Sequence, residues 1–213
     1  MYKGVKRALD VTFSLIGTAV SSPILLAVAA AIKLDSKGPV IFKQERLGKD
    51  GKVFEIYKFR SMCVGAEQMG TGQYSFKGDS RITRVGKIIR ATSLDELPQF
   101  INIIKGDMSF IGPRPTLTYH PWPLEEYSDF QRRRFEVRPG ITGLAQVHGR
   151  KAIDWNERIK YDVEYVDNLS LGLDCKILFR TVWNVLTMKD NNNIGKTSGK
   201  QEDENAQTDV HNK

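Results

Sequence analysis

The chain has 213 residues, a length typical of one domain with a hydrophobic core and short for two. Its 32 Lys and Arg residues exceed its 25 Asp and Glu residues and give a formal charge of +7, which favours anionic partners: phosphorylated substrates, nucleic acids or acidic membrane surfaces. Its two cysteines, Cys63 and Cys175, lie far apart and argue against a disulfide framework or a zinc site, so a cytoplasmic compartment is the simpler interpretation.

An apolar segment without charged side chains covers residues 11–32. It is long enough for the roughly 20 residues of a bilayer-spanning helix, and it is longer than the apolar part of a cleaved signal peptide. The alternative is a buried core helix of a soluble protein, which is disfavoured because apolar stretches of this length usually belong to membranes. The segment therefore predicts a membrane-associated helix in the mature protein.

Basic residues flank this segment on both sides, so the rule that retains basic flanks in the cytoplasm places both of its ends on one side of the membrane. Pro23 cannot donate a hydrogen bond to the carbonyl group of Ala19 and should bend the helix sharply. The hydroxyl groups of Ser21 and Ser22 can bond the freed carbonyl groups. We expect a re-entrant helix-break-helix, broken at Ser22 and Pro23, that enters one leaflet and returns. A kinked full span is the alternative.

Soluble-domain composition begins after Asp35. Two β-rich runs flank Lys49-Asp50-Gly51-Lys52, and an Asp-Gly pair is a strong signal for a hairpin turn. The glycine-rich stretch from Gly65 to Gly78 indicates a loop. In the following segment, apolar residues at helical spacing predict an amphipathic helix, and basic residues recur every third position beside them: Arg81, Arg84, Lys87 and Arg90. That cationic flank is either a solvated face or a surface for lipid headgroups and phosphates.

Ser93-Leu94-Asp95-Glu96 has two interpretations. Ser followed three residues later by Glu is the signature of a capping box, which would give both acids a structural role at the start of a helix. Alternatively, adjacent carboxylates beside Arg90 lie where phosphates and a divalent cation would be held. Successive helix residues point about 100° apart, so the two carboxylates would have different tasks: one attacks while the other positions a partner.

Rigid turns follow around two arginines. Pro113 and Pro115 flank Arg114, while Pro139 and Gly140 follow Arg138. Guanidinium groups on rigid backbone suit phosphate oxygens, although Arg-Pro turns are also frequent surface features. His120 and His148 lack zinc-ligand spacing and are interpreted as structural or surface residues.

The end of the chain differs from the rest. Residues 176–188 predict an amphipathic helix that packs on the core by default, with contact to the membrane interface as the alternative. Asp190 to Lys213 has almost no apolar residues and predicts a disordered tail. We therefore expect a membrane-associated segment at residues 1–35, a catalytic domain at 36–189 and a tail at 190–213.

Taken in order, Ser22-Pro23, YKFRSM, SLDELPQFINIIKGDMSFIGPRP and RPGITGLAQVHGR closely resemble the bacterial sugar transferase family, the small monotopic phosphoglycosyl transferases. The resemblance covers about residues 1–188. It implies an enzyme of the inner membrane that moves a phosphosugar from a UDP-sugar to polyprenyl (undecaprenyl) phosphate at the cytoplasmic face and releases UMP. This would be the first membrane step of glycoconjugate, exopolysaccharide or O-antigen synthesis, with downstream glycosyltransferases as further candidate partners.

The resemblance also implies residue roles. Its catalytic acid pair falls on Asp95 and Glu96, and its magnesium ligand falls on Asp95. Its substrate-binding positions fall on Lys58, Arg90, Pro113, Arg114 and Arg138. Gly65 stands where many relatives have Asp, which affects only the local loop. Magnesium and fixed arginines would offset the repulsion between a diphosphate and an attacking carboxylate, so Asp95 would form a covalent phosphosugar intermediate.

The expected fold is α+β: a mainly helical monotopic membrane protein with a re-entrant helix-break-helix, a β-hairpin and amphipathic interfacial helices. A non-catalytic membrane scaffold with a basic cytoplasmic face is the alternative, but it gives no reason for Asp95, Arg114 and Arg138 to occur together. A nucleic-acid partner is not expected, because the chain has no recognised binding motif and the apolar segment would be unexplained. The sequence specifies neither the sugar nor the oligomeric state.

Overall fold

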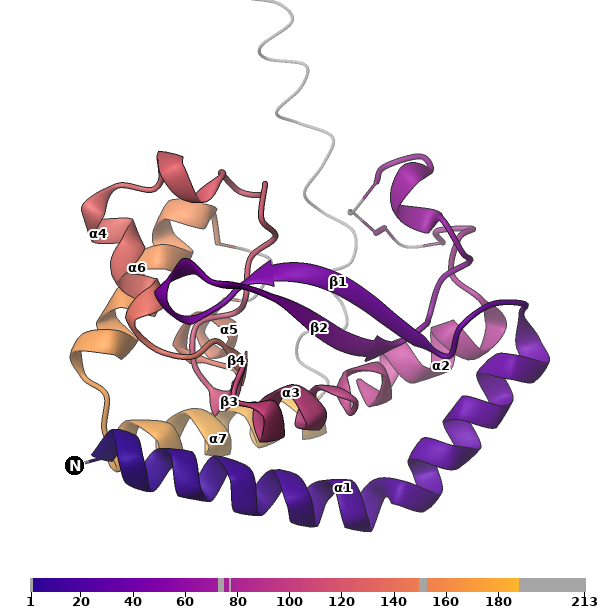
Figure 1. Cartoon of the computed structure of the whole chain (residues 1–213), viewed down its shortest axis with the longest axis horizontal. Coiled ribbons are helices and arrows are strands. Elements are labelled where there is room, and N and C mark those ends of the chain that lie inside the picture. The colour runs from indigo at the N-terminus through magenta and orange to yellow at the C-terminus, as the bar shows by residue number, and fades with distance from the viewer. Residues whose placement is uncertain (1, 73–74, 77, 150–152, 188–213) are drawn as a thin grey trace, which may run out of the picture.

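A computed structural model describes residues 2–72, 75–76, 78–149 and 153–187 (Figure 1). The tail predicted at 190–213 lies outside the described residues. The helices are α1 (Tyr2–Asp35), α2 (Arg84–Ala91), α3 (Gln99–Lys105), α4 (Asp129–Arg132), α5 (Leu144–His148), α6 (Trp155–Asp167) and α7 (Leu171–Leu186). The strands are β1 (Ile41–Leu47), β2 (Val53–Phe59), β3 (Ser109–Ile111) and β4 (Gly140–Thr142). The fold is mixed and mainly helical, as expected.

The N-terminal helix is bent but not broken. Pro23 lies inside α1, and Figure 1 shows the helix changing direction along its length. The hydroxyl group of Ser22 donates to the carbonyl oxygen of Ala19 at 2.8 Å, and that of Ser21 donates to the carbonyl oxygen of Gly17 at 2.6 Å. Pro23 has no backbone N–H, so the carbonyl oxygen of Ala19 lacks the helical donor that it would otherwise have. The expected bend and serine hydrogen bonds are therefore present, but the expected break is not, because the hydroxyl group of Ser22 replaces the lost donor and α1 remains one helix.

Polar contacts attach the first half of α1 to the rest of the chain. The ammonium group of Lys6 lies 2.8 Å from the carboxylate of Asp174 in α7, and the hydroxyl group of Tyr2 donates to the same carboxylate. Arg7 donates to the carbonyl oxygens of Ile103 and Ile104 at the end of α3. This half of α1 therefore lies against α3 and α7.

Apolar packing attaches the second half. Val28 and Ile32 are buried in a cluster with Phe59 of β2 and Ile89 of α2. At the end of the helix, the carboxylate of Asp35 accepts a hydrogen bond from the backbone N–H of Val85 at 3.0 Å. Both ends of α1 are thus bound to the same folded body.

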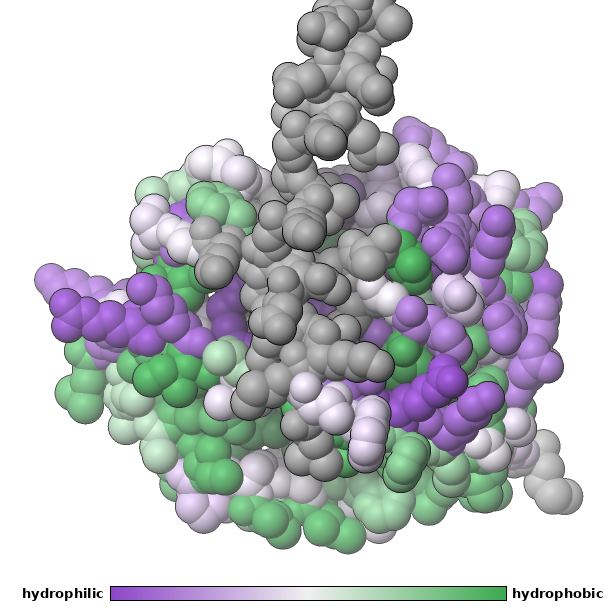
Figure 2. Space-filling view, turned by 180° about the vertical axis from the view of Figure 1, so that it is seen from behind, coloured by the Kyte–Doolittle hydropathy of each residue, from purple (hydrophilic) through white to green (hydrophobic). Residues whose placement is uncertain are grey.

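The remaining face of α1 is apolar and exposed. By length and composition α1 could cross a membrane, and few residues of its most apolar part are buried in the protein. The large exposed apolar side chains of this segment include Phe13, Leu15, Ile16, Val20, Ile24 and Leu26. Figure 2 shows apolar side chains gathered along the lower edge of the molecule, where α1 runs in Figure 1.

The predicted hairpin is confirmed. β1 pairs with β2 in antiparallel register from Ile41 opposite Phe59 to Leu47 opposite Val53. The turn between them places Asp50 and Gly51 at φ values of 58° and 72°, a left-handed conformation that Asp-Gly tolerates well. Ile56 on β2 packs against Ile103 of α3 in the core, so the hairpin is fixed above that helix.

A short parallel pair holds the segment after β3. Ser109 of β3 pairs with Gly140 of β4, and Ile111 pairs with Thr142. A Cβ atom at Gly140 would come within 2.1 Å of the backbone nitrogen of Gly112, so only glycine permits this approach. The backbone N–H of Gly140 donates to the carbonyl oxygen of Pro113 at 2.9 Å. Residues 112–114 therefore leave the strand in a fixed direction.

The predicted amphipathic helix is present as α2, with one correction to its cationic flank. Ile89 is buried, and Arg84 and Lys87 are exposed. Arg81 is instead buried in an ion pair with Asp79 at 2.7 Å, and its guanidinium group donates to carbonyl oxygens of the preceding loop. Arg81 lies before the helix begins, so helical spacing does not apply to it.

Candidate active site

Asp95 and Glu96 lie in a tight turn, Leu94–Glu96, between α2 and α3. Ser93 immediately before this turn adopts a left-handed conformation at φ 57°, which is uncommon for a residue other than glycine. In this conformation its side chain makes no capping hydrogen bond to the described backbone of the turn. The capping-box interpretation of Glu96 is therefore wrong.

Glu96 joins two basic residues from distant segments. Its Oε1 accepts a hydrogen bond from Lys58 of β2 at 2.8 Å and one from Arg114 at 3.3 Å. Burial disfavours the charged form of Glu96, but the charges and hydrogen bonds of Lys58 and Arg114 outweigh it and hold the pKa at about 2. Glu96 is therefore an ionised carboxylate that positions two cations.

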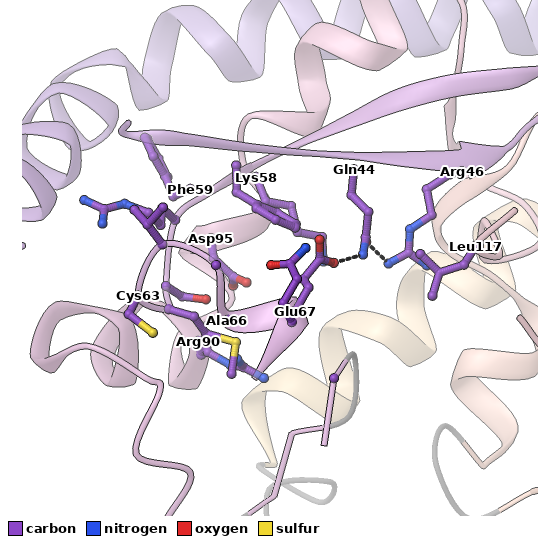
Figure 3. A pocket seen from close by; sticks show the side chains of 18 of the residues that line it. Gln44, Arg46, Lys58, Phe59, Cys63, Ala66, Glu67, Arg90, Asp95 and Leu117 are labelled. Carbon is purple, nitrogen blue, oxygen red and sulfur yellow. Dashed lines mark hydrogen bonds between the residues drawn. The ribbon is translucent and has the colours of Figure 1, made fainter. Parts of the chain in front are cut away.

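Asp95 has a different environment. Together with Lys58 and Arg90 it lines a pocket of about 430 Å³ (Figure 3). Burial raises its pKa, and so does the neighbouring Glu96, while the charges of Lys58 and Arg90 act in the opposite direction. The two adjacent carboxylates thus differ: Asp95 faces the pocket, and Glu96 is held in an ion-pair network beside it.

The backbone of Arg114 is supported from behind. The guanidinium group of Arg134 donates to the carbonyl oxygen of Arg114 at 2.8 Å and pairs with the carboxylate of Asp162 in α6 at 2.7 Å. Both members of this ion pair are almost fully buried. Pro113 is buried as well, so its contribution is to fix the chain direction rather than to line the pocket. Arg114 is therefore presented to Glu96 by a rigid turn.

The structure, over the residues it describes, does not bring Arg138 to this acid pair. Its guanidinium group donates to the carbonyl oxygen of Gly106 at 2.7 Å, at the opposite end of α3. Arg7 also binds this end of α3. The two arginines thus bind carbonyl groups at the C-terminal end of α3, where the helix supplies fewer backbone donors. A role for Arg138 in substrate binding stays a prediction.

Sequence motifs did not identify several residues of the pocket wall. Gln44 and Arg46 enter from β1, Glu67 from the loop after β2, and His120 and Trp155 from later segments. Side chains alternate between the two faces of a strand, so Gln44 and Arg46 lie on the same face. This spacing predicts that they lie together but says nothing of their function. The pKa of Arg46 falls to about 10, because burial and the charge of Arg114 disfavour its charged form.

The described residues contain no group of three or more His, Cys, Asp or Glu side chains able to hold a metal ion. Magnesium, however, commonly binds one or two carboxylates together with substrate phosphates and water. The carboxylate of Asp95, which lines the pocket between basic residues, fits that kind of site. Glu96 fits it less well, because Lys58 and Arg114 already occupy its Oε1.

Comparison with known proteins gives the family. Residues 1–188 match the family described as "Bacterial sugar transferase". The chain is 47% identical over 190 residues to the UDP-N-acetylgalactosamine-undecaprenyl-phosphate N-acetylgalactosaminephosphotransferase of Aeromonas hydrophila, and the match covers 88% of this chain and 45% of that protein. It is 44% identical to the "Uncharacterized sugar transferase EpsL" of Bacillus subtilis, with 85% of this chain and 87% of the relative covered.

A third relative is the UDP-glucose:undecaprenyl-phosphate glucose-1-phosphate transferase of Caulobacter vibrioides, 44% identical over 85% of this chain and 70% of that protein. The chain thus spans less than half of the Aeromonas protein and most of the other two. The family match, however, covers nearly all of this chain. The chain belongs to the bacterial sugar transferase family.

Proposed function

We propose that this chain transfers a sugar phosphate from a UDP-sugar to undecaprenyl or another polyprenyl phosphate and releases UMP. Its family and the activities named for the Aeromonas and Caulobacter relatives support this reaction. The observation that carries the proposal is the contrast between the two adjacent acids. Asp95 lines a pocket beside Lys58 and Arg90, whereas Glu96 is bound to Lys58 and Arg114.

In the first step, a carboxylate oxygen of Asp95 attacks the phosphorus atom that carries the sugar. A bond forms between this oxygen and phosphorus, and the bond from phosphorus to the bridging oxygen breaks. UMP leaves with the bonding electron pair, and the phosphosugar stays on Asp95 as an acyl phosphate. Lys58, Arg90 and Arg114 stabilise the negative charge on the phosphate oxygens, and Glu96 keeps Lys58 and Arg114 in place.

In the second step, a phosphate oxygen of the polyprenyl phosphate attacks the same phosphorus atom. The acyl phosphate bond breaks, and Asp95 is released as a carboxylate. The bond between the sugar carbon and its oxygen is never broken, so the anomeric configuration is retained. Two steps allow two large substrates to use one nucleophile in turn.

Asp95 would also hold magnesium together with the substrate phosphates, as the chemistry of a single carboxylate between basic side chains permits. When bound, the ion supplies positive charge that offsets the repulsion between the diphosphate and the carboxylate. Lys58 and Arg90 supply such charge from the protein itself.

We also propose that the chain is monotopic at the cytoplasmic face of the inner membrane. Both ends of α1 are bound to the same folded body, through Lys6 and Asp174 at one end and Asp35 and Val85 at the other. A full span would separate these ends by about 30 Å of hydrocarbon. A re-entrant α1, bent at Pro23, keeps both sets of contacts.

The exposed apolar side chains of α7 fit the same orientation. Figure 1 shows α7 next to α1 along the lower edge of the molecule. Phe179, Val182 and Trp183 are at least half exposed, with Lys176 and Arg180 beside them. Apolar and aromatic side chains next to long basic ones are typical of helices that lie in a membrane interface. The predicted interfacial helix thus has a surface suited to lipid.

Release of UMP from purified full-length protein in lipid tests the proposed activity. Wild type should release UMP from a UDP-sugar without acceptor, up to one equivalent, and continuously with polyprenyl phosphate. Asp95→Asn should release none in either case, and a chelator of divalent cations should stop the wild type. A folded, membrane-bound Asp95→Asn variant with normal turnover would refute the mechanism. A wild type that releases no UMP from any UDP-sugar would favour the non-catalytic scaffold.

A further inference from the structure

Three polar side chains, Arg46, Gln44 and Glu67, form a hydrogen-bonded row in the wall of the pocket that Asp95 also lines. Arg46 donates to the side-chain oxygen of Gln44, and the side-chain nitrogen of Gln44 donates to Oε1 of Glu67. Figure 3 shows this row as two dashed contacts, with Asp95 and Lys58 in the same pocket. Among the described residues, the second oxygen of Glu67, Oε2, accepts no hydrogen bond.

The loop that carries Glu67 is held in place by a buried side chain. Arg81 donates to the carbonyl oxygens of Ala66, Met69 and Gly72 at 2.8, 2.7 and 2.6 Å. Asp79 pairs with the same guanidinium group at 2.7 Å. Glu67 therefore has a defined position, fixed by Gln44 on one side and by the loop backbone on the other.

The pocket has a basic part around Lys58 and Arg90 and an acidic side chain at Glu67, which suit different chemical groups of a substrate. Lys58 and Arg90 act on Asp95, and cations at this position suit a diphosphate. Among the described residues that line the pocket, the acidic ones are Asp95 and Glu67. A carboxylate that takes no part in bond formation repels phosphate. Glu67 therefore suits a neutral part of the substrate that donates hydrogen bonds.

A UDP-sugar has three neutral parts: the uracil ring, the ribose and the donor sugar. A uracil ring presents two carbonyl acceptors and a single N–H donor, which makes a carboxylate a poor main partner for it. The ribose and the donor sugar both present hydroxyl groups, each of which can donate to a carboxylate oxygen. Of these two, the donor sugar is the one attached to the phosphorus atom that Asp95 attacks. It must therefore lie in the pocket that Asp95 and Glu67 share.

We infer that Glu67, held by Gln44, binds a hydroxyl group of the donor sugar and determines which UDP-sugar is used. The inference rests on the proposed function, because it needs a UDP-sugar in this pocket. A site built to bind a hydroxyl group with a charged acceptor discriminates strongly against a sugar that lacks or misplaces that group, since the carboxylate is then left without a partner.

The test is a panel of UDP-sugars that differ at single ring positions, with UMP release as the readout. Glu67→Gln should reduce the ratio of kcat/KM between the preferred and the epimeric sugar by about tenfold or more. Inhibition by UDP, which lacks the donor sugar but keeps the ribose, should stay unchanged. Gln44→Leu removes the partner of Glu67 and should reduce the same ratio. It gives a second measurement if Glu67→Gln does not fold.

Glu45→Gln is the matched control. Glu45 is an exposed neighbour of Gln44 on β1 and does not line the pocket, so the same loss of charge should leave both the ratio and the UDP inhibition unchanged. Three results would overturn the inference: equal losses for all sugars and for UDP in the Glu67→Gln variant, an unchanged ratio in the folded Glu67→Gln variant, or equal turnover of the whole panel by wild type. Absence of UMP release from wild type would instead refute the proposed function.

Discussion

Glu96→Gln removes one charge from the ion-pair network and nearly preserves its shape. The pKa of Glu96 falls from an ordinary 4.5 to about 2, and at 1.36 kcal/mol for each pKa unit the charged form is favoured by about 3 kcal/mol. This is an upper bound, because the side chain is 23% exposed and water screens part of the interaction. The amide keeps an acceptor for Lys58 or Arg114 but loses the charge that attracts both.

If about half of this interaction is expressed in the transition state, kcat falls about tenfold, and if all of it is expressed, kcat falls more than about 100-fold. Because the contacts of Glu96 are with Lys58 and Arg114, we expect a loss in kcat rather than a loss of the fold. Initial rates of UMP release at varied UDP-sugar concentration separate kcat from KM.

Glu126→Gln is the control for this substitution. The turn Leu124–Glu126 resembles Leu94–Glu96 in sequence and in conformation, and Glu126 is exposed. The control should retain full activity. A folded Glu96→Gln variant with wild-type kcat would refute the positioning role, because it would mean that Lys58 and Arg114 need no charged partner.

Three further outcomes are expected. Because the folded-state pKa of Glu96 lies below its unfolded value, its stabilising effect is present above about pH 4.5 and is lost as the pH falls towards 2. Urea unfolding should therefore show the stabilities of wild type and Glu96→Gln converging over that range. A constant difference between the two stabilities would contradict the lowered pKa. Arg134→Met should destabilise the fold by about 3–5 kcal/mol by leaving the carboxylate of Asp162 buried alone, and Asp162→Leu in the same chain should recover much of the loss in urea unfolding. Tags on both termini of wild type should be reachable only from the cytoplasm, and periplasmic labelling of the wild-type N-terminus would refute the re-entrant α1. Pro23→Ala restores the missing backbone donor and should expose part of the N-terminal tag to the periplasm.

Local sequence signals predicted the elements that local interactions determine. Asp50-Gly51 specifies a turn by its own conformational preferences, and the hairpin follows from it. The apolar periodicity of α2 and the apolar composition of α1 were likewise sufficient to predict that each segment forms a helix. The capping box failed although its pattern is local. Ser93 adopts a left-handed conformation in the folded chain, and there its side chain makes no capping hydrogen bond to the described turn.

Long-range contacts account for what the sequence did not reveal. Arg81 has the spacing of a surface cation, yet its guanidinium group is buried because carbonyl groups of the preceding loop, 9 to 15 residues earlier, converge on it. Gln44 and Glu67 meet only after the loop folds back over β1. Family resemblance implied that Lys58, Glu96 and Arg114 lie close together. They meet because three segments pack together: β2, the turn before α3 and the segment after β3.

The contacts at the start of α1 also bear on the order of events during synthesis. Lys6 leaves the ribosome long before its partner Asp174 in α7, which follows it by 168 residues. Arg7 must likewise wait for Ile103 and Ile104. In the proposed membrane-bound arrangement, α1 is therefore synthesised before the groups that bind its polar side chains. Docking of the N-terminal half of α1 is a late event, completed only when nearly the whole catalytic body has been translated.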